Sequence, residues 1–122
     1  MPGSGGYLTT HILDTARGLP ASGVVIELFQ LRSNSQRSKS ASATTNADGR
    51  TDTPILPETK FQIGTFELIF HIGDYFRHHD LVGTPPLFLD QIPIRFGIND
   101  ATAHYHVPLL ISPFGYSTYR GS

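Results

Sequence analysis

Two histidines separated by a single residue, His104 and His106, lie near the end of this chain of 122 residues. Imidazole gains or loses a proton near neutral pH, so such a pair can serve as acid, base or metal ligand. If residues 104–111 form a strand, alternate side chains point to opposite faces. We therefore expect both imidazoles on one face, and the apolar residues that alternate with them on the other: Tyr105, Val107 and Leu109.

A third histidine, His11, lies in a β-prone run at the other end of the chain. Together with His104 and His106 it could form a zinc site with three protein ligands and an open position, as catalytic zinc sites often have. The spacing by itself is weak evidence, because any strand brings residues i and i+2 to one face. Surface or hydrogen-bonded histidines are the commoner explanation, and the zinc hypothesis stays open at this point.

A second combination of residues could act on an anionic substrate without a metal. It joins a base that titrates near neutral pH to fixed cations, which would orient an anionic or enolate-like molecule. An arginine after a turn is usually just exposed charge, and a final serine is usually disordered. The residues in question are His11, Arg50, His106 and Ser122, with Tyr119 and Arg120 beside them.

Composition excludes several other classes of protein. Nine Lys and Arg against ten Asp and Glu give a net charge of −1, which is no footprint for nucleic acid. The absence of cysteine excludes disulfides and thiolate chemistry and fits a reducing compartment. No apolar run approaches the roughly 20 residues that span a membrane. We expect residues 1–6 to be a flexible lead-in without secretory character, and residues 7–122 to form one domain.

Short strands separated by turns account for most of the chain. We expect a polar, serine-rich edge or loop at 32–42, and a turn at 46–49 that places Arg50 directly after the bend. Pro93 indicates an edge strand or a bulge. A helix is expected over 74–82, capped by Asp74 and ended by Gly83. The strands are expected at 7–13, 24–31, 43–45, 65–72, 91–98 and 104–111, a pattern that favours an antiparallel β-sandwich.

Four short motifs carry a resemblance to a known family. They are residues 11–14 (His-Ile-Leu-Asp), 48–50 (Asp-Gly-Arg), 104–110 (His-Tyr-His-Val-Pro-Leu-Leu) and 119–122 (Tyr-Arg-Gly-Ser). In these motifs the chain resembles the transthyretin-related 5-hydroxyisourate hydrolases of purine breakdown, with no departure at the motif positions. The terminal Tyr-Arg-Gly-Ser is specific, because it separates the hydrolases from the hormone-carrying transthyretins.

The resemblance implies a fold, an assembly and a reaction. The fold would be a transthyretin-like antiparallel β-sandwich of two four-stranded sheets with one short helix, assembled as a homotetramer with its sites at the dimer–dimer interface. The reaction would be the hydrolytic opening of 5-hydroxyisourate to 2-oxo-4-hydroxy-4-carboxy-5-ureidoimidazoline, in urate degradation to allantoin, with neither cofactor nor metal. The implied catalytic residues are His11, Arg50, His106 and Ser122, and the implied substrate-binding residues are His11, Arg50, His104, Tyr119 and Arg120.

Each implied role has a chemical basis. A neutral His106 could take a proton from the attacking water, and Arg50 could stabilise the charge that develops on the carbonyl oxygen. His11 could hold the water, and Ser122 could orient His106 or the substrate through its hydroxyl or a carboxylate. His104 is the neighbouring histidine of the same motif.

Two alternatives remain open besides the zinc-dependent hydrolase. A transthyretin-like carrier without enzymatic activity would use the same fold, although burying the cations of this set against an apolar ligand costs energy. A purely structural sandwich would leave the terminal motif unexplained. The cytoplasm is the expected compartment, with the peroxisome as the alternative, because the last three residues are not a Ser-Lys-Leu type of address.

Overall fold

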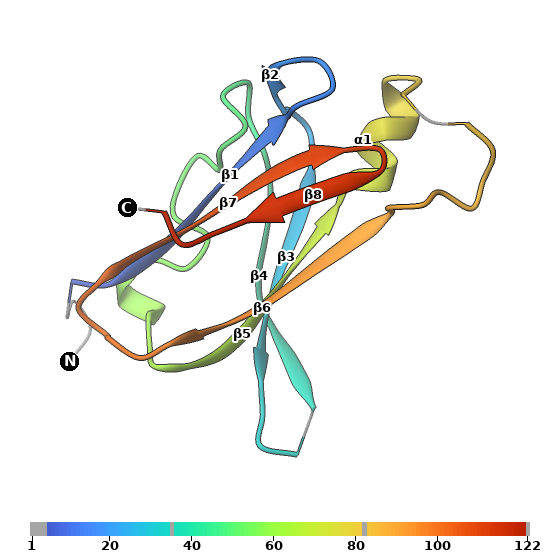
Figure 1. Cartoon of the computed structure of the whole chain (residues 1–122). Helices are drawn as coiled ribbons and strands as arrows, with labels where there is room; N and C mark the ends of the chain where they lie inside the picture. Colours follow the sequence, from blue (N-terminus) through green and yellow to red (C-terminus); the bar gives the residue numbers. More distant parts are fainter. Residues whose placement is uncertain (1–4, 35, 82, 122) are drawn as a thin grey trace.

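The computed structural model describes residues 5–34, 36–81 and 83–121. Two four-stranded sheets form a sandwich, and β1, β7 and β8 lie side by side in one of them (Figure 1). That sheet has the order β2-β1-β7-β8, with strands Leu19–Pro20, Tyr7–Asp14, His104–Ser112 and Gly115–Thr118. The other has the order β4-β3-β5-β6, with strands Arg37–Thr44, Val25–Leu31, Gly64–His71 and Gln91–Ile98. A short helix α1 (Ile72–His78) and a 3₁₀ turn (Glu58–Lys60) complete the described elements.

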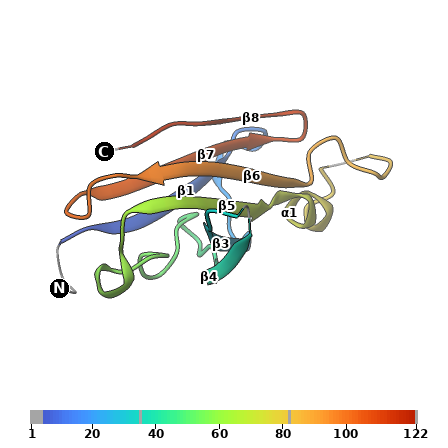
Figure 2. The ribbon, with the colours of Figure 1, turned by 90° about the horizontal axis from the view of Figure 1, so that it is seen from below.

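This architecture confirms the sandwich of two four-stranded sheets with one short helix. Most strand pairs are antiparallel, but β1 and β7 run parallel to each other. Figure 2 shows the edge strands β8 and β4 on opposite sides of the molecule, with β6 on the side of β8. Pro93 lies in β6, which is an edge strand as the sequence indicated.

Alternation along the strands builds the core between the sheets. In β1, Leu8, Thr10 and Ile12 are buried, while Thr9 and His11 between them are only partly buried. In β7 the side chains expected on the apolar face, Tyr105, Val107 and Leu109, are buried, and so are Pro108 and Ile111. Burying an aliphatic or aromatic side chain of this size contributes roughly 1.5–3 kcal/mol, so one face of each strand is strongly fixed inward. The opposite faces are left for the chemistry of the protein.

The polar stretch after β3 forms a longer strand than the sequence indicated. β4 covers Arg37–Thr44 and pairs with the whole of β3, with a shift in register between Leu28 and Phe29. Two cationic side chains of β4 form ion pairs with glutamates of the same sheet, Arg37 with Glu67 and Lys39 with Glu27. Charged side chains are typical of exposed edge strands, which explains why a strand here lacks the usual apolar signature.

The helix begins and ends earlier than expected. It covers Ile72–His78 instead of 74–82, and its N-cap is His71, which forms no side-chain capping hydrogen bond. Asp74, the expected cap, lies in the first turn and pairs with Arg77. Burial decides the position, because Ile72 continues from β5 straight into the core. Val82 lies outside the described residues.

A buried carboxylate ties the end of β1 to the helix. Asp14 is fully buried and accepts hydrogen bonds from the Tyr75 hydroxyl (2.7 Å) and from Arg17 Nε (3.1 Å). Burial by itself would raise the pKa of Asp14, but the hydrogen bonds from Tyr75 and Arg17 outweigh it, and the pKa lies below its ordinary value. The carboxylate therefore stays ionised and connects the two segments.

Packing starts one residue before the expected domain boundary. Gly6 is buried, and a Cβ at this position would lie 2.3 Å from the Phe61 ring and 2.4 Å from the Ala101 carbonyl oxygen. Residues 1–4 of the expected lead-in lie outside the described residues. In the part of the chain that the structure describes, no helix is long and apolar enough to cross a membrane.

Candidate active site

The parallel pairing of β1 with β7 brings the two ends of the sequence together. The register places Tyr7 beside His104, Thr9 beside His106 and His11 beside Pro108. Their inward neighbours Leu8 and Tyr105 are buried, so the named pairs point away from the core. Two adjacent strands thus present a continuous row of polar and aromatic side chains on the outer face of the sheet.

The Thr9 hydroxyl lies between the two histidines of β7. Thr9 Oγ1 is 2.6 Å from His104 Nε2 and 2.7 Å from His106 Nδ1. On its other side, the His104 ring stacks on Tyr7, with ring centroids 4.2 Å apart and planes inclined by 12°. Since Nδ1 of His106 is engaged, Nε2 is the ring nitrogen that remains for a substrate or a water molecule.

A tight turn brings Arg50 to the same surface. Gly49 has φ +74°, and a Cβ here would lie 2.5 Å from the carbonyl oxygen of Ile12, so a side chain is excluded. The Ile12 N–H donates to the Gly49 carbonyl (2.9 Å). Beside it, the backbones of His11 and Arg50 pair in an isolated antiparallel β-bridge. The expected turn at 46–49 is confirmed, and it holds Arg50 against β1.

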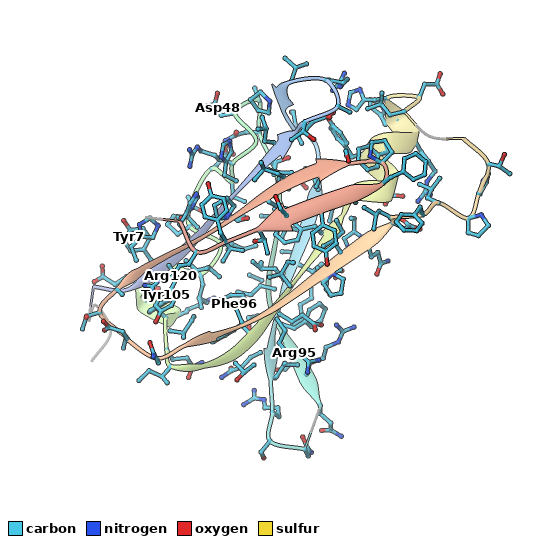
Figure 3. All side chains as sticks on the ribbon, viewed as in Figure 1. Tyr7, Asp48, Arg95, Phe96, Tyr105 and Arg120 are labelled. Atoms are coloured by element: carbon cyan, nitrogen blue, oxygen red, sulfur yellow. The ribbon has the colours of Figure 1, made fainter. Side chains whose placement is uncertain are left out.

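The end of the chain folds back over His106. The Gly121 N–H donates to the carbonyl of His106 (2.8 Å), and the Gly121 backbone packs against the His106 ring and Pro108. Arg120 points elsewhere: its guanidinium carbon lies 4.0 Å from the centre of the Tyr105 ring. Figure 3 labels the two side chains next to each other. Ser122 lies outside the described residues.

A pocket of about 300 Å³ opens beside these residues. It is lined by Tyr7, Thr9, Thr10, Arg50, Thr51, His104 and His106. Tyr119 and Arg120, which the resemblance assigns to substrate binding, line a different cavity of about 670 Å³ between β6 and β8. A single chain therefore brings together His104, His106 and Arg50 but not Tyr119 or Arg120.

Two histidines at this site are held in the neutral form. Burial lowers the pKa of His106, and the positive charge of Arg50 together with His104 and His11 lowers it further. Burial and Arg50 likewise lower the pKa of His11, against an opposing hydrogen bond to the Asp48 backbone carbonyl. At neutral pH both side chains are available as bases and not as cations.

The three-histidine zinc site does not form in the described part of the chain. Among residues 5–34, 36–81 and 83–121, no three His, Asp or Glu side chains lie close enough to share a metal ion. The hydroxyl of Thr9 occupies the space between His104 and His106, whose ring centroids are 6.0 Å apart. The histidines are hydrogen-bonded to their neighbours and are not arranged as ligands.

Sequence reasoning missed Tyr7, Thr9, Thr10 and Thr51 as parts of the site. Tyr7 and Thr9 alternate with buried residues and share a face with His11, which was a usable signal. Their importance depends on which strand lies beside β1, and the pattern of one strand does not reveal its neighbour.

The amino-acid sequence of the chain matches a known protein family. The model of the family described as HIUase/Transthyretin matches residues 8–121. The chain belongs to this family. Among its relatives, 5-hydroxyisourate hydrolase 2 of Rhizobium meliloti (strain 1021) is 54% identical over 117 residues, which are 96% of this chain and 97% of the relative.

Solved structures agree with membership of the HIUase/Transthyretin family. The crystal structure of (S)-allantoin synthase is 42% identical with a TM-score of 0.89, and the match covers 96% of this chain and 44% of that one. Sea bream transthyretin in complex with thyroxine is 27% identical with a TM-score of 0.83, covering 93% of each chain. The resemblance drawn from the four motifs is confirmed, and so is the transthyretin-like sandwich.

Proposed function

We propose that this chain is a 5-hydroxyisourate hydrolase, which opens its substrate to 2-oxo-4-hydroxy-4-carboxy-5-ureidoimidazoline on the route from urate to allantoin. The observation that carries the proposal is a neutral His106 facing the same small pocket as the cation of Arg50. A relative that is 54% identical over 97% of its length is named 5-hydroxyisourate hydrolase 2. The chain is accordingly a hydrolase that acts on the C–N bond of a cyclic amide.

His106 acts as the general base in this proposal. Its Nε2 takes a proton from water while the water oxygen forms a bond to the ring carbonyl carbon. The C–N bond of the amide then breaks, and the proton moves from Nε2 to the departing nitrogen. A positioned base of this kind is worth roughly 10²–10⁴-fold in rate. The lowered pKa keeps the His106 ring neutral at neutral pH, so that one of its nitrogens can accept a proton, as the first step requires.

Arg50 stabilises the negative charge that develops on the carbonyl oxygen. It forms no ion pair with a described residue, so its charge is available to the substrate. A fixed donor aimed at a developing oxyanion is among the largest contributions to catalysis. The bridge between Arg50 and His11 fixes the arginine backbone beside β1. The cation thus has a defined place relative to His106.

The remaining assignments complete the proposed site. His11, oriented by the Asp48 carbonyl, holds the attacking water, and His104 helps to bind the substrate. Ser122 is proposed to orient His106 or the substrate, and the pairing of its neighbour Gly121 with His106 supports this. For Tyr119 and Arg120 substrate binding stays a prediction for the assembled protein.

We propose a homotetramer whose sites lie at the interface between two dimers. The outer face of the β2-β1-β7-β8 sheet supports this, because the pocket opens there, beside β1 and β7. Exposed apolar side chains on or next to that sheet would be removed from water at a subunit interface: Leu19, Phe114 and Tyr116. Sedimentation analysis measures the assembly directly.

We also propose the cytoplasmic location expected from the sequence, which fractionation of the source cells would test.

The carrier alternative has no support in this pocket. Thyroxine is the ligand in the sea bream transthyretin structure. Here an arginine and two histidines line the pocket, and enclosing an unpaired cation against an apolar ligand costs energy. The polar lining favours a small polar substrate.

The test is to generate 5-hydroxyisourate freshly with urate oxidase and to follow its decay with and without the protein. We expect acceleration over the spontaneous decay, and loss of most of it in His106→Ala and in Arg50→Ala. His78→Ala is the matched control, since His78 is an exposed histidine of α1 outside the pocket. An unchanged decay in the presence of folded wild-type protein would overturn the proposal.

A further inference from the structure

The hydroxyl group of Thr9 makes two short hydrogen bonds with two different imidazoles. The distances are 2.6 Å to His104 Nε2 and 2.7 Å to His106 Nδ1, shorter than the usual 2.9–3.0 Å between nitrogen and oxygen. The three groups come from two strands that the parallel register places side by side. Thr9 belongs to none of the motifs that identified the family.

The number of protons in this bridge allows only two arrangements when both rings are neutral. A threonine hydroxyl has one hydrogen to donate, so it donates to one imidazole and accepts from the other. If Thr9 donates to His104, His106 carries its proton on Nδ1, and Nε2 is free to act as a base. If Thr9 donates to His106, the His106 proton sits on Nε2, which can then only donate. The tautomer of one histidine thus fixes that of the other.

We propose that Thr9 is a positioning residue that couples the tautomers of His104 and His106 and passes a proton between them during catalysis. This inference rests on the proposed hydrolase function. It assigns Thr9 a role through His106 and not by contact with the reacting atoms.

The proton transfers balance as follows. His106 Nε2 takes a proton from the attacking water as the new C–O bond forms. The Nδ1 proton of His106 moves to Thr9 Oγ1, and the hydroxyl proton of Thr9 moves to His104 Nε2. His104 is then the cation, while His106 is neutral with a proton on Nε2. When the C–N bond breaks, that proton goes to the departing nitrogen, and the relay runs backwards to restore the starting tautomers.

His104 and His106 have different neighbours. His104 stacks on the electron-rich face of Tyr7 at 4.2 Å, and an aromatic face attracts a cation. His106 instead faces the positive charge of Arg50 and the neighbouring imidazole of His11. Both effects act in the same direction, so transfer through Thr9 moves the charge away from Arg50 and towards Tyr7.

The kinetic test replaces the hydroxyl while keeping the shape of the side chain. Thr9→Val should lower kcat by about 10–100-fold, which is the scale known for partners that orient metal-ligating histidines. KM should change little, and Thr9→Ser, which restores a hydroxyl, should recover most of kcat. Thr15→Val is the matched control: Thr15 directly follows β1, and its Oγ1 donates to the Ile111 carbonyl of β7 at 2.9 Å, away from the pocket. It should keep the wild-type rate.

A spectroscopic readout separates coupling from simple structural support. Nitrogen-15 NMR of the imidazoles distinguishes a protonated ring nitrogen from an unprotonated one. In the wild type at high pH we expect His106 and His104 both to carry their proton on Nδ1. In Thr9→Val both should shift towards the Nε2–H tautomer that free imidazole side chains prefer, whereas Thr9→Ser should retain the wild-type spectrum.

The outcomes distinguish this inference from the function on which it rests. A wild-type protein that does not accelerate the decay of 5-hydroxyisourate overturns the proposed function and the relay with it. Wild-type hydrolysis together with an undiminished kcat in Thr9→Val overturns the relay alone. Unchanged histidine tautomers in a folded Thr9→Val protein overturn the coupling, whatever the rate.

Discussion

Replacing Gly121 by alanine should displace His106 without unfolding the protein. A Cβ at this position would lie 2.6 Å from Cδ2 of the His106 ring and 3.2 Å from Cγ of Pro108. Carbon atoms prefer a separation of about 3.5–4.0 Å, so one side must move by roughly 1 Å. Pro108 is rigid and buried, and the Gly121 N–H is fixed to the His106 carbonyl. The His106 imidazole is held through the hydroxyl of Thr9, so we expect this ring to move away from the added methyl group.

The size of the effect follows from that displacement. A misplacement of about 1 Å at a reacting group can lower the rate by about 10²-fold, which raises the barrier by about 2.7 kcal/mol. We therefore expect kcat/KM of Gly121→Ala to fall by roughly that factor, with the midpoint of thermal unfolding close to that of the wild type. The assay is the decay of freshly generated 5-hydroxyisourate, measured beside a thermal melt of each variant.

Gly115→Ala provides the control for this variant. The added Cβ would meet only Ser112 Oγ at 3.7 Å, an ordinary contact, and Gly115 opens β8 in the same terminal segment. It should retain the wild-type rate. If Gly121→Ala hydrolyses as fast as Gly115→Ala, the terminal segment does not position His106, and the reasoning from this contact is refuted.

Four further outcomes are expected. Arg50→Ala removes a cation that disfavours the imidazolium, so the pKa of His106 should rise and the acidic limb of the residual pH–rate profile should move to higher pH; an unmoved limb would contradict this. Tyr75→Phe removes a donor to the Asp14 carboxylate and should lower the free energy of unfolding in urea by about 1.5–3 kcal/mol, with normal hydrolysis. Deleting residues 119–122 should abolish hydrolysis while circular dichroism still reports the sandwich. Treatment with a strong chelator should leave the rate unchanged; loss on chelation with recovery on added zinc would contradict the metal-free mechanism.

The apolar face of β7 was predictable from the sequence, because it depends on alternation within one segment. Tyr105, Val107 and Leu109 were placed inward on that basis, and they are buried. The turn before Arg50 was predictable for a similar reason, since a glycine with positive φ has a local signature.

Features that depend on distant parts of the chain were not predictable in the same way. The polar strand β4 is stabilised by pairing with β3 and by ion pairs to Glu27 and Glu67, not by its own composition. The helix starts at Ile72 because that side chain is buried, which overrides the capping preference of Asp74. Thr9 lies between two histidines because of the parallel register of β1 with β7, which the sequence of one strand does not reveal.

That register also sets when the site can appear as the protein folds. Thr9 and His106 are 97 positions apart in the sequence, and the two strands that carry them enclose nearly all of the chain. Closing a loop of that length costs about 4 kcal/mol of chain entropy before any contact compensates for it. Long-range pairing of this kind is slow compared with local pairing. We therefore expect hairpins such as β3–β4 to form early and the catalytic pocket to form among the last structures, so that a nascent chain emerging from the ribosome gains activity only once its last strands have joined its first.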